Sequence, residues 1–137
     1  MDLDTVRGFF AQAPFMVDLG VEPVAVAPGK LSTKLVIATR HLQHTGQVHA
    51  GVMAAMADHT MGAAAQSLAP EGHWALTAEL KTAQLRPARG ERLVCEAVVL
   101  KAGRNLSFTE AEVYAEAAGQ RTLVMKASAT MALAKAG

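Results

Sequence analysis

The chain has 137 residues, enough for one folded domain with a single hydrophobic core and too few for two independent domains. Thirteen basic and twelve acidic side chains give a net charge of +1, which provides no field to attract nucleic acid or an acidic membrane. The single Cys95 cannot form an intrachain disulfide, the N-terminus lacks a signal-peptide pattern, and no apolar run is long enough for a membrane span. We therefore expect a cytoplasmic protein.

The N-terminal part of the chain is predicted to form one short helix and a strand hairpin. The helix begins at an acidic cap, Asp2 or Asp4, and continues to Ala13, because Pro14 ends it. Two strand segments with alternating apolar residues then flank a Pro-Gly turn: residues 21–27 and 31–37.

Residues 49–69 form the longest apolar stretch, which contains no proline and is rich in alanine. This composition predicts a long helix of about five turns. Apolar residues occupy all of its sides, as in a helix at the centre of a domain. Asp58 and His59 interrupt the stretch. A carboxylate is costly to bury in such a helix without a partner, so Asp58 is a candidate functional group.

The last half of the chain is predicted to consist of strands joined by short turns, which make neighbouring strands antiparallel. The four segments are residues 74–85, 91–101, 105–116 and 121–133. We therefore expect a single α+β domain over residues 1–137, in which an antiparallel sheet of five or six strands wraps around the helix of residues 49–69.

The spacing of His49 and Asp58 predicts a dimer. Nine positions place the two side chains on opposite sides of a helix and about 13 Å apart along its axis. One straight helix cannot bring them into one site, whereas an antiparallel second copy can, and this favours a two-fold homodimer. The amides of Ala50 and Gly51 at the helix start can bind a carbonyl oxygen that develops negative charge, unless Thr45 or water caps them.

The motif Q-x-x-G-x-x-H-x-G-x6-D, from Gln43 to Asp58, resembles the signature of hotdog-fold acyl-CoA thioesterases of the PaaI-like, phenylacetate-degradation type. It is also similar to that of the 4-hydroxybenzoyl-CoA thioesterases, and the resemblance extends over nearly the whole chain. It implies a hotdog fold, a homodimer that often pairs into a dimer of dimers, and hydrolysis of an aromatic or medium-chain acyl-CoA without a metal or organic cofactor. The usual His-Gly-Gly of the motif is His49-Ala50-Gly51 here.

The resemblance also implies roles for individual residues. Asp58 is the nucleophile or the general base that activates water, and the Ala50 amide polarises the thioester carbonyl beside His49. Gln43 of the neighbouring subunit orients the water or the carbonyl, and Thr77 helps to position the water. Three arginines lie in segments that in relatives meet the phosphates of coenzyme A: Arg86, Arg89 and Arg104. Apart from the resemblance, the Gly51 amide is expected to bind the substrate carbonyl, and Met61, three residues past Asp58, to line the acyl pocket.

Two other functions stay open. A hotdog hydratase or dehydratase would also use one histidine and one acid, and His44 precedes Asp58 at a plausible distance, although the Pro-rich segment of such dehydratases is missing. A non-catalytic module would bind acyl-CoA without turnover. No histidine pair has the spacing of a helical zinc motif, so we expect no metal and a solvated or structural role for His59. Trp74 and Cys95 are expected to serve packing.

Overall fold

The computed structural model describes residues 1–136 and contains, within that range, three α-helices, one 3-10 helix and six strands. In chain order these are α1 (Leu3–Ala11), α2 (Pro14–Leu19), β1 (Val21–Ala27), β2 (Lys30–Val36), η1 (Thr39–His41), α3 (Ala50–Gln66), β3 (His73–Gln84), β4 (Arg92–Ala102), β5 (Leu106–Ala117) and β6 (Gln120–Lys135). The strands form one sheet in the order β1-β2-β4-β5-β6-β3, and every neighbouring pair is antiparallel.

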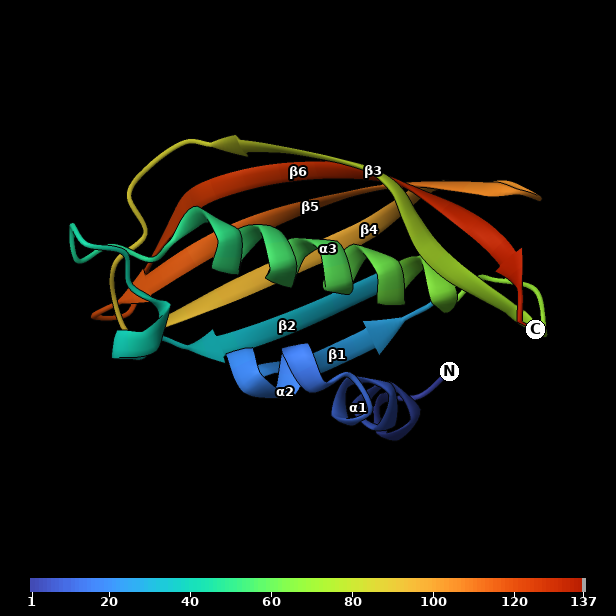
Figure 1. Cartoon of the computed structure of the whole chain (residues 1–137), viewed down its shortest axis with the longest axis horizontal. Helices are drawn as coiled ribbons and strands as arrows, with labels where there is room; N and C mark the ends of the chain where they lie inside the picture. The colour runs from blue at the N-terminus through green and yellow to red at the C-terminus, as the bar shows by residue number, and fades with distance from the viewer. Residues whose placement is uncertain (137) are drawn as a thin grey trace.

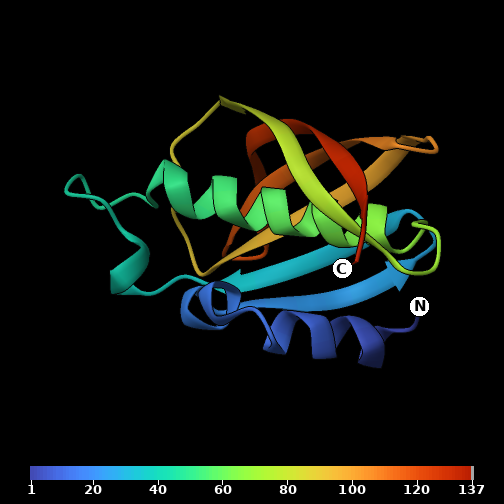
Figure 2. The ribbon, with the colours of Figure 1, turned by 45° about the vertical axis from the view of Figure 1, so that its right-hand side comes forward.

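The sheet curves around α3, which lies along its concave face (Figure 1). Seen from a second side, α1 and α2 flank β1 at one edge of the sheet (Figure 2). One face of α3 is buried in the core, largely against β4 and β5, through Met53, Met56, Ala57, Thr60, Met61, Ala64 and Ala65. The predicted architecture, an antiparallel sheet of five or six strands around a long helix, is confirmed, and the sheet of the described residues has six strands.

Two short helices, rather than the one predicted, precede the first strand. Asp2 caps α1, and its Oδ1 atom accepts a hydrogen bond of 2.8 Å from the Thr5 amide. α1 ends at Ala11, and Pro14 begins α2, where its missing N–H breaks no helical hydrogen bond. Gly20 ends α2 in the left-handed conformation, with φ of +86°. The prediction of a single N-terminal helix was therefore wrong, because the same proline that ends one helix starts another.

The C-terminal end of α3 is tied to the segments beside it. The helix ends at Gln66, three residues before the predicted boundary. The Gln66 side-chain amide donates to His73 O at 2.8 Å, and its Oε1 atom accepts from the Ala75 amide at 2.9 Å. The Ser67 hydroxyl accepts a hydrogen bond of 2.8 Å from the Gly29 amide. The Gln66 bonds fix the start of β3 against the end of α3, and the Ser67 bond fixes the turn between β1 and β2 there.

β3 is an edge strand, and one of its edges has no partner strand in the single chain. Every residue from Leu76 to Gln84 is exposed. The register of β3 against β6 shifts between Thr77 and Glu79, which marks a β-bulge. Bulges redirect the side chains next to them, and Thr77 lies at this irregular point of β3.

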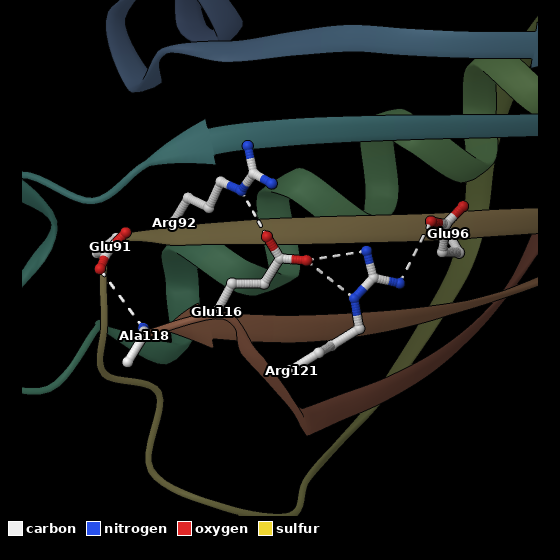
Figure 3. Close-up of polar contacts among 6 residues, drawn as sticks. All are labelled: Glu91, Arg92, Glu96, Glu116, Ala118 and Arg121. Atoms are coloured by element: carbon white, nitrogen blue, oxygen red, sulfur yellow. Dashed lines mark hydrogen bonds and ion pairs between the residues drawn. The ribbon is translucent and has the colours of Figure 1, made fainter.

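The sheet face away from α3 carries an ion network at one end of β4, β5 and β6 (Figure 3). Arg92 Nε donates to Glu116 Oε1 at 2.5 Å, and Arg121 Nη2 lies 2.9 Å from the second carboxylate oxygen of Glu116. Arg121 also lies 3.9 Å from Glu96. The hydrogen bond from Arg92, followed by that from Arg121, lowers the pKa of Glu116. In the adjacent turn between β5 and β6, Ala118 adopts a left-handed conformation with φ of 51°.

Candidate functional site

Asp58, in the middle of α3, forms a hydrogen bond with a residue of β3. Thr77 Oγ1 donates to Asp58 Oδ1 at 2.6 Å, although nineteen positions separate the two residues in the sequence. The β-bulge begins directly after Thr77, whose hydroxyl group points toward α3. Asp58 Oδ2 has no hydrogen-bond partner within residues 1–136, so the carboxylate keeps one oxygen available.

A cavity of about 350 Å³, here named the Asp58 cavity, opens beside this pair between α1, α3 and the start of β3. Three aromatic side chains line it: Phe9, Phe10 and Trp74. Phe9 and Trp74 pack edge to face, with their ring centroids 6.4 Å apart. Trp74, which the sequence assigned to packing, therefore packs against α1 and also contributes to a wall next to the carboxylate.

Small residues of α3 form the floor of the Asp58 cavity. Gly62 and Ala63 lie one turn after Asp58 and the residue that follows it, and both line the cavity. A Cβ atom at Gly62 would meet only Met131 Cε, at 3.9 Å. Met61, predicted to contact the acyl group, is fully buried in the core and does not line this cavity, because it lies on the helix face that packs against the sheet.

His59 contributes an imidazole ring to the same cavity. The ring packs edge to face on Phe10, with centroids 4.6 Å apart and an interplanar angle of 88°. Burial lowers the pKa of His59, and the negative charge of Asp58 opposes this effect only in part. The imidazole is therefore neutral at physiological pH, with one nitrogen that can donate a hydrogen bond and one that can accept.

A second cavity of about 350 Å³, here named the Ala50 cavity, lies at the N-terminal end of α3, where Gln43, Ala50 and Arg86 contribute to its wall. His49 is the N-cap of the helix, and its Nδ1 atom accepts a hydrogen bond of 2.8 Å from the Gly51 amide. The Ala50 amide has no acceptor within residues 1–136. Of the two amides expected to be free, the Gly51 amide is therefore occupied and the Ala50 amide is available.

The loop that leads into α3 is anchored by a buried histidine. His41 Nε2 lies 2.7 Å from Leu19 O at the end of α2, and its Nδ1 atom accepts from the Ala38 amide at 2.9 Å. The backbone carbonyl of His41 accepts from the His49 amide at 2.9 Å. These contacts hold both ends of the loop that carries Gln43, and they fix the direction in which α3 begins.

The two cavities lie on different parts of the chain and share no lining residue. His49 and Asp58 are separated by nine helical residues, which corresponds to about 13 Å along α3. The structure thus brings Asp58 and Thr77 together at one cavity and Gln43 and Ala50 at the other. One chain does not join these two groups.

The three arginines predicted to meet the phosphates of coenzyme A also lie apart. Arg86 donates to Leu123 O at 2.8 Å beside the Ala50 cavity, and the Arg89 guanidinium lies next to Gly46 in the neighbouring loop. Arg104 lies in the turn between β4 and β5, at the opposite end of β6 and about 30 Å away along that strand. One phosphate group cannot contact all three arginines of a single chain.

Other candidate groups of the described chain do not converge on a site. Cys95 is buried in the core, as expected, and burial raises the pKa of its thiol to about 12. Within residues 1–136 no three His, Cys, Asp or Glu side chains form a group that could hold a metal ion. In the same range, no helix has the length and apolar character that crossing a membrane requires.

A sequence model of the thioesterase superfamily matches residues 45–122, more than half of the chain and the segment that contains both cavity-lining ends of α3. The chain belongs to the thioesterase superfamily. This member shares its fold with a thioesterase family protein from Silicibacter pomeroyi, with a TM-score of 0.93 and 33% sequence identity over 96% of this chain and 97% of the other.

Two further proteins resemble this thioesterase superfamily member over a smaller share of their length or with lower sequence identity. The PaaI protein from the phenylacetic acid degradation operon of Escherichia coli gives a TM-score of 0.85 over 95% of this chain and 91% of the other, but its 17% identity shows the fold alone. A candidate esterase from Caenorhabditis elegans is 33% identical over 93 residues, which cover 67% of this chain and 54% of that protein. The chain thus spans about half the length of that relative. The predicted hotdog fold and thioesterase resemblance are confirmed.

Proposed function

We propose that the protein hydrolyses an acyl-CoA thioester to a carboxylic acid and free coenzyme A, with Asp58 as the nucleophile or the general base. The observation that carries this proposal is the Asp58 carboxylate, held by the Thr77 hydroxyl at 2.6 Å beside a cavity with an aromatic wall. An acyl group fits such a wall, and the second carboxylate oxygen, which has no hydrogen-bond partner within residues 1–136, is available to act on the thioester. Membership of the thioesterase superfamily supports the reaction class.

The proposed active site is built by two chains. β3 runs antiparallel to α3, so that Thr77 at its start lies beside the Asp58 cavity and Gln84 at its end lies beside the Ala50 cavity. Antiparallel pairing of the free β3 edges of two copies, centred near residue 80, would set the start of one strand against the end of the other. The Asp58 cavity of each chain then adjoins the Ala50 cavity of its partner. We propose this homodimer as the active form.

The chemistry needs one base, one oxyanion donor and one leaving group. Asp58 removes a proton from water, or attacks the carbonyl carbon itself, and the new C–O bond replaces the C–S bond of the thioester. The negative charge on the carbonyl oxygen is stabilised by the partner subunit's Ala50 amide at the positive end of its helix. Coenzyme A leaves as a thiolate and takes up the proton that the water lost. In the direct route, water then cleaves the Asp58 anhydride.

His49 and Gln43 complete the oxyanion side in this proposal. Because His49 Nδ1 accepts from the Gly51 amide, the proton of the neutral ring resides on Nε2, which is left as a second donor. Gln43 lines the Ala50 cavity and can orient the water or the carbonyl oxygen. Arg86 lines the Ala50 cavity and Arg89 lies against Gly46 in the neighbouring loop, so these two are the candidates of this chain for the phosphates of coenzyme A, whereas Arg104 lies at the opposite end of β6.

The test is release of free thiol from a panel of aromatic and aliphatic acyl-CoAs by the wild-type protein and by Asp58→Asn. We expect turnover to fall by about 10²–10⁴-fold in the variant, because the amide can neither attack nor take a proton. Asp18→Asn, an exposed acid on α2, is the matched control and should behave as wild type. Equal turnover in both variants, or none in the wild type, would contradict the proposal.

Isotope incorporation distinguishes the two routes. In a single turnover with labelled solvent water, labelled oxygen in the Asp58 carboxylate would identify the direct route, with water attacking the Asp58 carbonyl of the anhydride, whereas the general-base route leaves that carboxylate unlabelled. Acyl-CoA binding without thiol release would identify a binding module. Loss of enoyl absorbance without thiol release would identify a hydratase.

A further inference from the structure

We propose that a third cavity, between α1, α2 and β1, binds a carboxylate with an apolar tail and serves as an effector site for the Asp58 cavity. The binding itself does not depend on the proposed function. The effector role does rest on it, because it assigns the Asp58 cavity to the acyl group.

The third cavity, here named the α1–β1 cavity, has a volume of about 520 Å³, larger than that of the Asp58 cavity or the Ala50 cavity. It lies where α1 and α2 flank the edge strand β1 (Figure 2). Val17 and Val24 are 57% and 46% exposed there, so folding of the single chain leaves apolar surface uncovered. A cavity of this size and character is typical of a site for the apolar part of a small molecule. Its apolar lining residues are Phe10, Ala11, Val17, Val21, Pro23 and Val24.

The charged groups beside the α1–β1 cavity favour an anion. Lys34 lines this cavity and a smaller adjoining one of about 280 Å³, to which Arg40 contributes. Arg40 donates to two backbone carbonyls, those of Asp18 at 3.2 Å and Leu19 at 3.3 Å, and no carboxylate of residues 1–136 pairs with it. Glu22 lines both cavities, and its carboxylate lies 3.9 Å from Lys34 Nζ. Two cations and one acid leave a single positive charge, which a monoanion such as a carboxylate matches.

A small ligand fits this place better than a strand of another protein chain. β1 is an edge strand, but Pro23 has no N–H group to donate, and the register of β1 shifts between Pro23 and Ala25. Both features impede strand pairing at this edge. Arg7 also lines the cavity, but Asp4 already pairs with it at 3.5 Å. β1 and β3 are opposite edges of the sheet, so the homodimer proposed above leaves the α1–β1 cavity open.

Phe10 connects the α1–β1 cavity with the Asp58 cavity, because it lines both. Its ring packs edge to face on His59, with centroids 4.6 Å apart, and the neighbouring Phe9 packs on Trp74. A ligand tail that contacts Phe10 would hold α1 in its docked position and stabilise this wall of the Asp58 cavity. Because acyl-CoA needs the same wall, the carboxylate and the substrate should favour each other's binding.

The binding test is valine-methyl NMR of the protein without acyl-CoA, titrated with carboxylates of increasing chain length. Val17, Val21 and Val24 line the α1–β1 cavity, whereas no valine of the described chain lines the Asp58 cavity. Octanoate should shift these three methyl resonances and shift that of Val48, at the Ala50 cavity, by less. Each further buried methylene group should tighten binding by about three- to fourfold. Acetate lacks the tail and octanol lacks the charge, so both should bind more weakly than octanoate.

Variants of the lining residues locate the site. Val24→Asp places an acid in the α1–β1 cavity and should weaken octanoate binding by about tenfold or more, whereas Leu100→Asp, at an exposed position of β4 outside the cavity, is the matched control. Lys34→Gln should weaken binding by about two- to fivefold, because it removes one cation of an exposed pair. Glu22→Gln removes the opposing acid and should tighten binding.

Two results would overturn the inference at the level of binding. The first is that octanoate leaves the valine methyl resonances of the α1–β1 cavity unshifted, or binds equally well to Val24→Asp and Leu100→Asp. The second is a higher oligomer that Val24→Asp dissociates, because the cavity would then be an interface with a second copy of the chain.

The effector role is measured with the acyl-CoA that the protein hydrolyses best. The readout is the KM with saturating octanoate divided by the KM without it, in the wild type and in Val24→Asp. Octanoate that competes in the Asp58 cavity raises this ratio in both proteins, whereas the effector site lowers it in the wild type alone. We expect the ratio to be lower in the wild type by about twofold or more. Equal ratios would contradict the effector role. If no acyl-CoA is hydrolysed, the proposed function fails, and the NMR titration still decides whether the cavity binds a carboxylate.

Discussion

Replacing Ala50 with proline removes the N–H group that we propose as the oxyanion donor and changes little else. Ala50 is the first residue of α3, a position that proline accepts without breaking a helical hydrogen bond. The preceding His49 has φ of −62° and ψ of 136°, an extended conformation that is compatible with a following proline. The Ala50 amide has no acceptor within residues 1–136, so no internal hydrogen bond is lost. The fold should therefore tolerate the change.

The expected effect on the reaction is large. Loss of one oxyanion donor lowers kcat by about 10²–10³-fold, which corresponds to about 2.7–4 kcal/mol. The melting temperature should stay close to that of the wild type, because the substitution creates no cavity and no clash is expected at this position. Ala50→Gly, which keeps the N–H group, is the matched control and should retain most of the rate. A proline variant that hydrolyses acyl-CoA as fast as the glycine variant would refute the assignment of this amide.

Mixing two variants tests whether the site is shared between chains. Asp58→Asn and Ala50→Pro should each be nearly inactive alone. In a mixed dimer, one of the two sites combines both defects, and the other combines the intact Asp58 with the intact Ala50. Random exchange of subunits makes half of the dimers mixed, so about a quarter of the wild-type activity should return. No recovery after confirmed exchange would mean that each site lies within one chain.

Three further predictions concern the site and the stability of the fold. Thr77→Val removes the hydroxyl that donates to the proposed catalytic carboxylate. It should lower kcat by about tenfold, which corresponds to the loss of one charge-assisted hydrogen bond at an exposed position. Thr82→Val, on the same strand, should leave kcat unchanged. Gly62→Ala should raise stability by up to about 1 kcal/mol in thermal unfolding and slow the turnover of bulky acyl groups, whereas Gly8→Ala in α1 should give a similar gain without a change in substrate preference. Glu116 has a lowered pKa, so its contribution to stability is present above its ordinary pKa and is lost as the pH falls. In Glu116→Gln, the free energy of unfolding should therefore fall less steeply toward acid pH, as measured by chemical denaturation at several pH values. An equally steep fall in the variant and the wild type would mean that the ion network contributes nothing.

Much of the fold could be predicted because the strands alternate and the turns are short. The predicted ends of the helices were wrong where one residue type is compatible with two local structures. Pro14 ends one helix and begins another, and only the packing of the six residues that follow decides between a loop and α2. α3 ends at Gln66, whose side chain bonds the backbone of β3, a tertiary contact that helix propensity does not contain.

Part of the candidate site could also be predicted from the sequence. Helical spacing correctly implied that His49 and Asp58 do not meet in one chain. The family resemblance predicted only that Thr77 helps to position the water, and its hydrogen bond with Asp58 comes from the structure. The walls of the Asp58 cavity were missed, because they depend on how α1 packs against α3 and β3. Phe10 has the same apolar pattern wherever the helix docks, and only the docked position puts it on His59. Burial of that histidine has no signal in a single sequence.

The bridge that Gln66 makes between α3 and β3 has a consequence for the order of folding. Asp58 and Thr77 flank one short chain reversal, so their meeting requires the closure of a small loop at low entropic cost. The loop before α3 is held instead by distant contacts, such as the hydrogen bond from the Val48 amide to Ala88 O. In pulse-labelled amide exchange during refolding, we expect the amides of α3 and β3 to become protected before those of this loop. A newly made chain would then assemble its acid before its oxyanion donor, and it would acquire activity only when the slower half is in place.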